Sequence, residues 1–148
     1  MLKAVLDAGA VTALRTGAAA VLAAETLGRS DATTAAVIGA GVNGQAAART
    51  FLARGKRVRL WDIDTARAAS VAESIGAEAA FSQDEALAAD LLVTVTPGRE
   101  VVLREGSLQP GQHASLMGAD GSQGRKGRTG IANPRSWTDL SSSGMRST

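Results

Sequence analysis

The chain has 148 residues, of which 45% are hydrophobic and 3% aromatic, with a formal net charge of +2. This size and hydrophobic content suit one soluble globular domain, and the lack of cysteine excludes disulfides, thiolate metal sites and a cysteine nucleophile. No apolar run reaches the roughly 18 residues that span a bilayer, and the start lacks the long apolar core of a signal peptide. We therefore expect a cytoplasmic protein with no membrane partner.

The positive charge is concentrated at the carboxyl end. Residues 1–120 hold 11 Lys/Arg against 13 Asp/Glu, a net charge of −2, whereas residues 121–148 hold 5 against 1, a net charge of +4. The body of the chain therefore offers no basic groove for a phosphate backbone, and its few aromatic side chains offer no platform for stacked bases. We expect no nucleic-acid partner.

The first predicted element is a long helix over residues 11–27, because VTALRTGAAAVLAAETL is rich in alanine and leucine and Gly28 follows as a C-cap. Residues 35–38 are short and apolar, which predicts a buried parallel strand. A second helix is expected over residues 45–54. Residues 57–61 alternate charged and apolar side chains, the period of a strand exposed on one face.

Further helices and strands alternate along the rest of the chain. Asp64 is expected to cap a helix over residues 65–75 that ends before Gly76, and Ser82 and Glu85 have capping-box spacing for a brief helix. Short strands are expected at residues 79–81, 91–96 and 113–117. This order predicts an α/β protein with a largely parallel sheet, flanking helices and right-handed crossovers.

Three glycines in VIGAGVNG match the spacing G-x-G-x-x-G between the first strand and the second helix. In such a motif Gly39 makes the tight turn, Gly41 lets the backbone approach a pyrophosphate, and Gly44 allows close packing of helix on strand. The first turn of the helix then presents free N–H groups and a positive dipole end to the phosphates. The context predicts a Rossmann-type dinucleotide-binding fold.

An acidic residue follows at the end of the second strand. Asp62 lies 23 residues after Gly39, close to the offset of roughly 20 residues expected for the carboxylate that binds the adenine ribose. A carboxylate there accepts hydrogen bonds from the 2′ and 3′ hydroxyls and repels a 2′-phosphate, so NAD is favoured over NADP. Two alternatives remain open: a glycine-rich connection with a capping aspartate, and a 2′-phosphate bound by Arg57, Arg59 or Arg67.

Five segments, in this order and spacing, closely resemble the ornithine cyclodeaminase, μ-crystallin and archaeal alanine dehydrogenase family over residues 5–121. They are TALRTGAAA, VIGAGVNGQ, VRLWDID, VTVTPGRE and LQPGQHASLMGADG. The resemblance implies an NAD-dependent enzyme that acts on a small amino acid or cyclic imine and forms a homodimer. In the cyclodeaminase an amino acid is oxidised to an imine, the side-chain amine expels ammonia, and reduction gives proline; relatives interconvert an amino acid with a ketimine or keto acid.

The resemblance also implies roles for particular residues. Arg15 reaches the substrate carboxylate and lies near the cofactor, and Asp120 is the acid/base that handles protons of the substrate amine, which a carboxylate can do when its geometry and pKa suit. The residues implied in cofactor binding are Arg15, Thr16, Gly39, Gly41, Val42, Asn43, Gly44, Asp62, Thr96, Met117, Gly118 and Ala119. Taken alone, Arg15 could simply extend to solvent, and Asp120 could serve a turn.

Other features argue against alternative chemistries. His113 is the only histidine and lies where the family varies, so a partly buried strand histidine is expected rather than a catalytic one. No cluster has metal-ligand spacing and no G-x-S-x-G motif is present. A binding protein of the μ-crystallin type without turnover stays an alternative, as does an unrelated small Rossmann reductase or nucleotide sensor, for which the RTGA segment would have no explanation.

The chain departs from the family at both ends. It opens almost directly at the RTGA helix, whereas relatives carry a large upstream segment, and residues 121–148 hold 5 glycines and 6 serines without an amphipathic period. We therefore expect a leading helix within residues 1–30, a Rossmann domain over residues 31–120 and an irregular tail over residues 121–148. We hypothesise that the chain is a fragment or a truncated gene product whose reading frame is altered after about residue 121.

Overall fold

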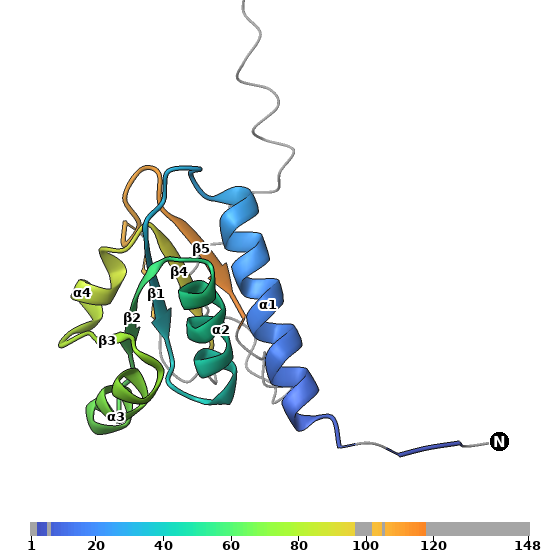
Figure 1. Ribbon diagram of the computed structural model, residues 1–148. Helices are drawn as coiled ribbons and strands as arrows, with labels where there is room; N and C mark the ends of the chain where they lie inside the picture. The colour runs from blue at the N-terminus through green and yellow to red at the C-terminus, as the bar shows by residue number, and fades with distance from the viewer. Residues whose placement is uncertain (1–2, 6, 97–101, 105, 118–148) are drawn as a thin grey trace, which may run out of the picture.

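The computed structural model describes residues 3–5, 7–96, 102–104 and 106–117. Their strands form one sheet in the order β3-β2-β1-β4-β5, and every neighbouring pair is parallel (Figure 1). The strands are β1 (Thr34–Ile38), β2 (Arg57–Trp61), β3 (Glu78–Ala79), β4 (Leu91–Thr94) and β5 (His113–Leu116). The helices are α1 (Gly9–Leu27), α2 (Val42–Ala53), α3 (Thr65–Ile75) and α4 (Gln83–Leu87). The predicted α/β fold with a parallel sheet is confirmed.

Local sequence signals explain most of these boundaries. The alternation in β2 is reflected in its burial, with Val58 and Leu60 buried and their neighbours more exposed. Asp64 caps α3, since its side chain accepts a hydrogen bond from the Arg67 N–H at 3.0 Å, and Gly76 ends the helix in a left-handed conformation. The prediction for α2 was wrong at its start, because the helix begins at Val42 rather than three residues later.

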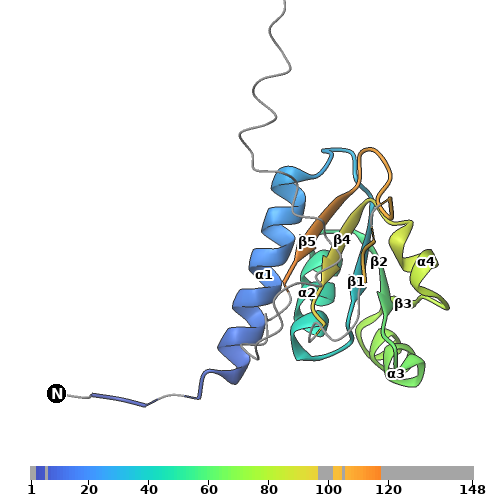
Figure 2. The ribbon, with the colours of Figure 1, turned by 180° about the vertical axis from the view of Figure 1, so that it is seen from behind.

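The two faces of the sheet are covered unequally (Figures 1 and 2). One face packs against α1, α2 and α3, and the core there includes Ala35 and Val37 of β1. The alternate residues Ala36 and Ile38 face the short helix α4 on the other side. Apart from Phe51, the side chains of this core are aliphatic; the largest are Phe51, Ile38, Leu60, Leu91, Leu92, Val21, Val37 and Val93.

Small residues let α1 pack closely on its neighbours. A Cβ on Gly17 would lie 2.7 Å from backbone atoms of Ala46 and Ala47, so only glycine fits this crossing with α2. Gly28 is the C-cap of α1, as expected, but its backbone is extended rather than left-handed, and a Cβ there would lie 2.5 Å from the Leu91 side chain. Close approach, not turn geometry, therefore requires glycine at this C-cap.

α1 is also the one helix among the described residues that is long and apolar enough to cross a membrane by length and composition. Its mean hydropathy reaches 1.2 over 18 residues, near the amino terminus. The apolar composition of α1 is also explained by packing, because its small residues contact α2, β4 and β5 closely in the core. A single helix of this kind is weak support for a membrane span.

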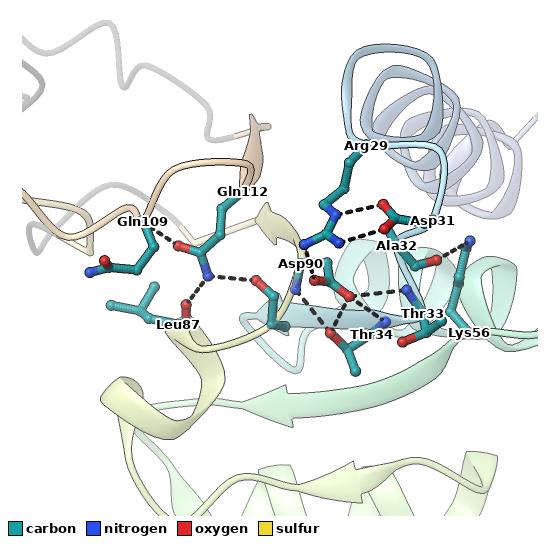
Figure 3. Close-up of polar contacts among 11 residues, drawn as sticks. Arg29, Asp31, Ala32, Thr33, Thr34, Lys56, Leu87, Asp90, Gln109 and Gln112 are labelled. Atoms are coloured by element: carbon teal, nitrogen blue, oxygen red, sulfur yellow. Dashed lines mark hydrogen bonds and ion pairs between the residues drawn. The ribbon is translucent and has the colours of Figure 1, made fainter.

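A cluster of polar contacts ties the amino ends of β1 and β4 together (Figure 3). Asp90, just before β4, accepts hydrogen bonds on Oδ2 from the N–H groups of Thr33 and Thr34, both at 3.0 Å, and from the Thr34 hydroxyl at 2.8 Å. Arg29 lies 3.7 Å from the other carboxylate oxygen. The N–H and hydroxyl of Thr34, then Thr33 and Arg29, lower the pKa of Asp90 although burial opposes them.

Removing this carboxylate is expected to destabilise the sheet. The variant Asp90→Ala leaves the partly buried N–H of Thr34 and the exposed N–H of Thr33 without their acceptor, so near pH 7 we expect the free energy of unfolding to fall by about 2 kcal/mol in urea titrations. The folded-state pKa lies below the unfolded value of about 4, so the stabilisation is present above that pH and is lost as the pH falls through the folded-state pKa. The difference between Asp90→Ala and wild type should therefore shrink as the pH falls below the unfolded value of about 4. The control is Glu73→Ala, on the exposed face of α3. If Asp90→Ala lowered the free energy of unfolding no more than this control does, the role of Asp90 would be contradicted.

Candidate active site

The glycine turn lies at the carboxyl end of β1, where the chain changes direction across the sheet. β2, the next strand in sequence, pairs with β1 on one side. After β3 the chain crosses back, and β4 pairs with β1 on the other side. In open parallel sheets, ligands bind beyond the carboxyl ends of the strands at such a point, because the loops diverge there. The position of Gly39 and Gly41 thus matches that of a ligand site in this class of fold.

Two of the three glycines are required by the chain itself. Gly39 has φ +113°, a conformation that other residues rarely adopt, and a Cβ there would lie 3.0 Å from the Val95 carbonyl oxygen. A Cβ on Gly44 would overlap the Gly39 carbonyl oxygen and lie 3.2 Å from the Val95 side chain. These two residues therefore hold α2 tightly against the turn and against the end of β4.

Gly41 is different, because nothing in the described chain requires it to be glycine. Its φ of −71° suits any residue, and a Cβ built there meets no heavy atom within 4 Å. Gly41 is the N-cap of α2, and the described residues supply neither a side-chain cap nor an acidic residue in the first turn of that helix. The helix thus begins with N–H groups open to a ligand, at a point where backbone can approach it closely.

Asp62 follows β2 beside this turn and is held firmly. Its Oδ2 accepts a hydrogen bond from the Ala40 N–H at 2.7 Å, and its Oδ1 accepts from the Asp64 N–H at 2.9 Å and from Arg67 Nη2 at 2.6 Å. Only 6% of the residue is exposed. Burial opposes ionisation, but the hydrogen bonds from Arg67, Ala40 and Asp64 outweigh it and lower the pKa of Asp62. The carboxylate is therefore charged and fixed at neutral pH.

The structure separates the three arginines that the sequence left as alternatives for a 2′-phosphate. Arg67, on α3, pairs with Asp62 and lies at the carboxyl end of the strands. Arg59 pairs with Glu78 and Glu85, at 3.5 and 3.7 Å. Arg57 begins β2, and its N–H donates to the Thr33 carbonyl at the opposite end of the sheet. Only Arg67 of the three lies beside Asp62, and sequence spacing alone could not select it.

The predicted substrate arginine lies on the amino-terminal half of α1. Arg15 is exposed and has no hydrogen bond or ion pair with another described residue, and Thr16 beside it is half-buried. Two residues further on, Gly17 packs against the second turn of α2. This half of α1 lies at the end of the sheet that carries the glycine turn (Figure 1). Arg15 is thus an unpaired cation at that end of the described chain.

Two more predicted residues extend this end of the sheet. The Val95 N–H donates to the Ile38 carbonyl at 2.9 Å, so the segment leading to Thr96 continues beside the glycine turn after β4 has ended. The Met117 N–H donates to the Thr94 carbonyl at 2.8 Å, and its side chain packs on the core. Gly118, Ala119 and Asp120 lie outside the described residues, so the roles expected of them stay predictions.

His113 is a partly buried residue of β5, as expected. Its Nε2 lies 3.3 Å from the Ser115 hydroxyl, which in turn donates to the Ala20 carbonyl of α1. His113 pairs with Leu91 at the amino end of the strands, away from the glycine turn. Across the described part of the chain, no group of three or more His, Cys, Asp or Glu residues is placed to hold a metal ion.

The parallel sheet, the glycine turn at its change of direction and the fixed carboxylate at the end of β2 define the class of dinucleotide-binding Rossmann-type domains. Within that class, the chain belongs to the ornithine cyclodeaminase/mu-crystallin family, whose sequence model matches residues 1–129.

Curated relatives agree with this assignment. The chain is 36% identical over 124 residues to a putative dehydrogenase of Rhizobium meliloti, covering 78% of this chain and 38% of that protein. It is 36% identical over 120 residues to the ornithine cyclodeaminase of Agrobacterium fabrum, covering 74% of this chain and 34% of that protein. The chain thus spans little more than a third of the length of these relatives.

Three solved structures of similar fold contain a bound nicotinamide cofactor. The Δ1-pyrroline-2-carboxylate reductase of Thermococcus litoralis, solved with NADH and L-proline, has a TM-score of 0.61 at 26% identity and covers 74% of this chain and 36% of that one. An archaeal alanine dehydrogenase dimer with bound NAD has a TM-score of 0.60 at 33% identity, covering 73% and 36%. A shikimate 5-dehydrogenase of Thermus thermophilus with NADP(H) and shikimate has a TM-score of 0.55 at 28% identity, covering 68% and 41%.

Proposed function

We propose that this chain is the NAD-binding part of an ornithine cyclodeaminase-like enzyme, which converts ornithine to proline with loss of ammonia. The observation that carries the proposal is Gly41, where no described residue requires a glycine and where the start of α2 lies open beside the ion-paired Asp62. The pyrophosphate of a dinucleotide needs such an approach to backbone N–H groups, and its adenine ribose needs a carboxylate acceptor. NAD is favoured over NADP because Asp62 is charged.

The proposal assigns a task to each group at the carboxyl end of the sheet. The N–H groups of Val42, Asn43 and Gly44 bind the pyrophosphate, and Thr96 and Met117 line the nicotinamide side together with residues 118–119. Bound nicotinamide would supply the hydride acceptor and donor. Arg15 on α1, which pairs with no other described residue, holds the substrate carboxylate, since a guanidinium fork matches a carboxylate in two hydrogen bonds. Asp120 takes the proton of the substrate amine and returns it.

A reductase of cyclic imines is the second candidate. The Thermococcus reductase was solved with NADH and L-proline, which is also the product of the cyclodeaminase, so the same end of the sheet can serve either reaction. An alanine dehydrogenase reaction, or dinucleotide binding without turnover, would need the same cofactor contacts. Homodimer formation is part of the proposal, supported by the dimeric archaeal alanine dehydrogenase of similar fold.

A titration of the purified full chain with NADH tests the cofactor proposal. We expect saturable enhancement of nicotinamide fluorescence and an upward shift of the midpoint of thermal unfolding with NADH concentration, because a ligand that binds only the folded state stabilises it. If neither NADH nor NADPH enhanced the fluorescence or raised the unfolding midpoint, the proposed cofactor binding would be refuted. Incubation with NAD and ornithine then distinguishes a cyclodeaminase, which releases ammonia and proline, from a binding protein, which releases neither.

A further inference from the structure

Arg67 lies at the mouth of the ribose site proposed above. Its Nη2 donates to Asp62 Oδ1 at 2.6 Å, and its Nη1 lies 3.9 Å from Asp64 Oδ2. The Arg67 side chain is 49% exposed, whereas that of Asp62 is only 8% exposed. The pair therefore joins a fixed, buried carboxylate to a guanidinium that has room to move toward solvent.

The hydrogen bonds of Asp62 leave little room for a ribose. A carboxylate has about four lone-pair positions, two on each oxygen. On Oδ1 both are taken, by the Asp64 N–H and by Arg67, and on Oδ2 one is taken by the Ala40 N–H. A ribose diol donates two hydrogen bonds, so the second hydroxyl must displace Arg67 from Oδ1. Arg67 and the ribose therefore compete for the same acceptor.

The same guanidinium is suited to a 2′-phosphate. Asp62 alone would repel that group, but Arg67 neutralises the carboxylate and carries donors that match two phosphate oxygens. The other two arginines considered for this task do not lie beside Asp62, as the pairing of Arg59 with Glu78 and the position of Arg57 at the start of β2 show. The side chain of Arg67 is half exposed, so its remaining guanidinium donors are accessible to such a phosphate from solvent.

We propose that Arg67 determines the cofactor specificity of this chain: it competes with the ribose of NAD(H) for Asp62 and binds the 2′-phosphate of NADP(H). This inference rests on the dinucleotide binding proposed above. It predicts that the chain binds both NADH and NADPH. The charge of Asp62 favours NADH, and Arg67 reduces this preference because it binds the 2′-phosphate of NADPH.

The test is a fluorescence titration of the full chain with NADH and with NADPH, for wild type and Arg67→Gln. We expect the Kd for NADPH to rise about tenfold or more in the variant, because a charge-assisted contact to phosphate is lost. The Kd for NADH should stay the same or fall, because the acceptor on Oδ1 becomes free. A merely structural role would raise both Kd values together, so the ratio of the two is the decisive readout.

Two further variants serve as controls. Arg57→Gln removes the same charge from the exposed amino end of β2 and should leave the ratio of Kd values unchanged. Arg67→Lys keeps the charge and should retain part of the NADPH binding. An unchanged ratio in Arg67→Gln, or a wild type that binds NADH but no NADPH, would overturn the role of Arg67. Failure of the wild type to bind either cofactor would refute the proposed function itself.

Discussion

The variant Gly44→Ala should lose a substantial part of the stability of the domain together with its cofactor binding. The added Cβ would overlap the Gly39 carbonyl oxygen, and Gly39 is itself fixed, because its N–H donates to the Trp61 carbonyl at 2.8 Å and its φ is +113°. The backbone of α2 or of the turn must therefore shift. Buried overpacking of this kind costs about 3 kcal/mol, which lowers the midpoint of thermal unfolding by roughly 10 °C in a domain of this size.

Thermal unfolding followed by circular dichroism measures this loss, and NADH titration at low temperature measures binding by the fraction that remains folded. Gly41→Ala is the matched control for stability. It makes the same chemical change three residues earlier in the chain, where a Cβ meets no heavy atom of a described residue within 4 Å. Equal unfolding midpoints for the two variants would show that Gly44 is not a packing requirement of the turn.

Local patterns in the sequence were sufficient for most of the fold. Residues 57–61 and 65–75 were predicted with the bounds that β2 and α3 have, because alternation, a capping aspartate and a terminal glycine are all short-range signals. The glycine motif also predicted the place of the turn relative to the sheet, since a parallel strand followed by a helix brings it to the carboxyl end.

Two other features could not be predicted from the sequence: the choice between neighbouring hydrogen-bond partners, and the pairing of strands across the sheet. The expected capping box at α4 formed only in part: the Ser82 hydroxyl accepts from the Glu85 N–H at 3.2 Å, but Glu85 reaches the Phe81 N–H instead of that of Ser82. The strand predicted over residues 91–96 ends at Thr94, where its partner β1 also ends. Pairing across the sheet, not propensity, set that boundary.

In the candidate site, too, local spacing predicted some residues, whereas others depend on contacts in three dimensions. Gly39, Gly41, Gly44 and Asp62 were readable from spacing because each lies at a fixed offset along one β-α-β unit. The sequence could not predict that Arg67, of the three arginines, lies beside Asp62, because this depends on whether each side chain lies at the carboxyl end of the strands. The one available signal was its position, five residues after Asp62 in the first turn of α3.

The variant Gly41→Ala should abolish most cofactor binding and leave the fold intact. At an N-cap, glycine and alanine differ by about 1 kcal/mol or less, and the φ of −71° suits alanine, so the free energy of unfolding should change little. A Cβ at this position would nevertheless occupy the space through which a pyrophosphate reaches the first N–H groups of α2. Loss of two such charge-assisted hydrogen bonds corresponds to an increase of the NADH Kd by about a hundredfold or more.

Fluorescence titration with NADH, and urea unfolding of the same preparation, separate these two effects. We expect Gly44→Ala to fail in both measurements and Gly41→Ala in binding alone, because among the described residues only the Cβ of the former meets protein atoms. If Gly41→Ala binds NADH as tightly as wild type, the open space above the turn is not where the pyrophosphate lies. The open backbone at Gly41 would then lose its explanation, and the proposed cofactor site would have to be placed elsewhere on the chain.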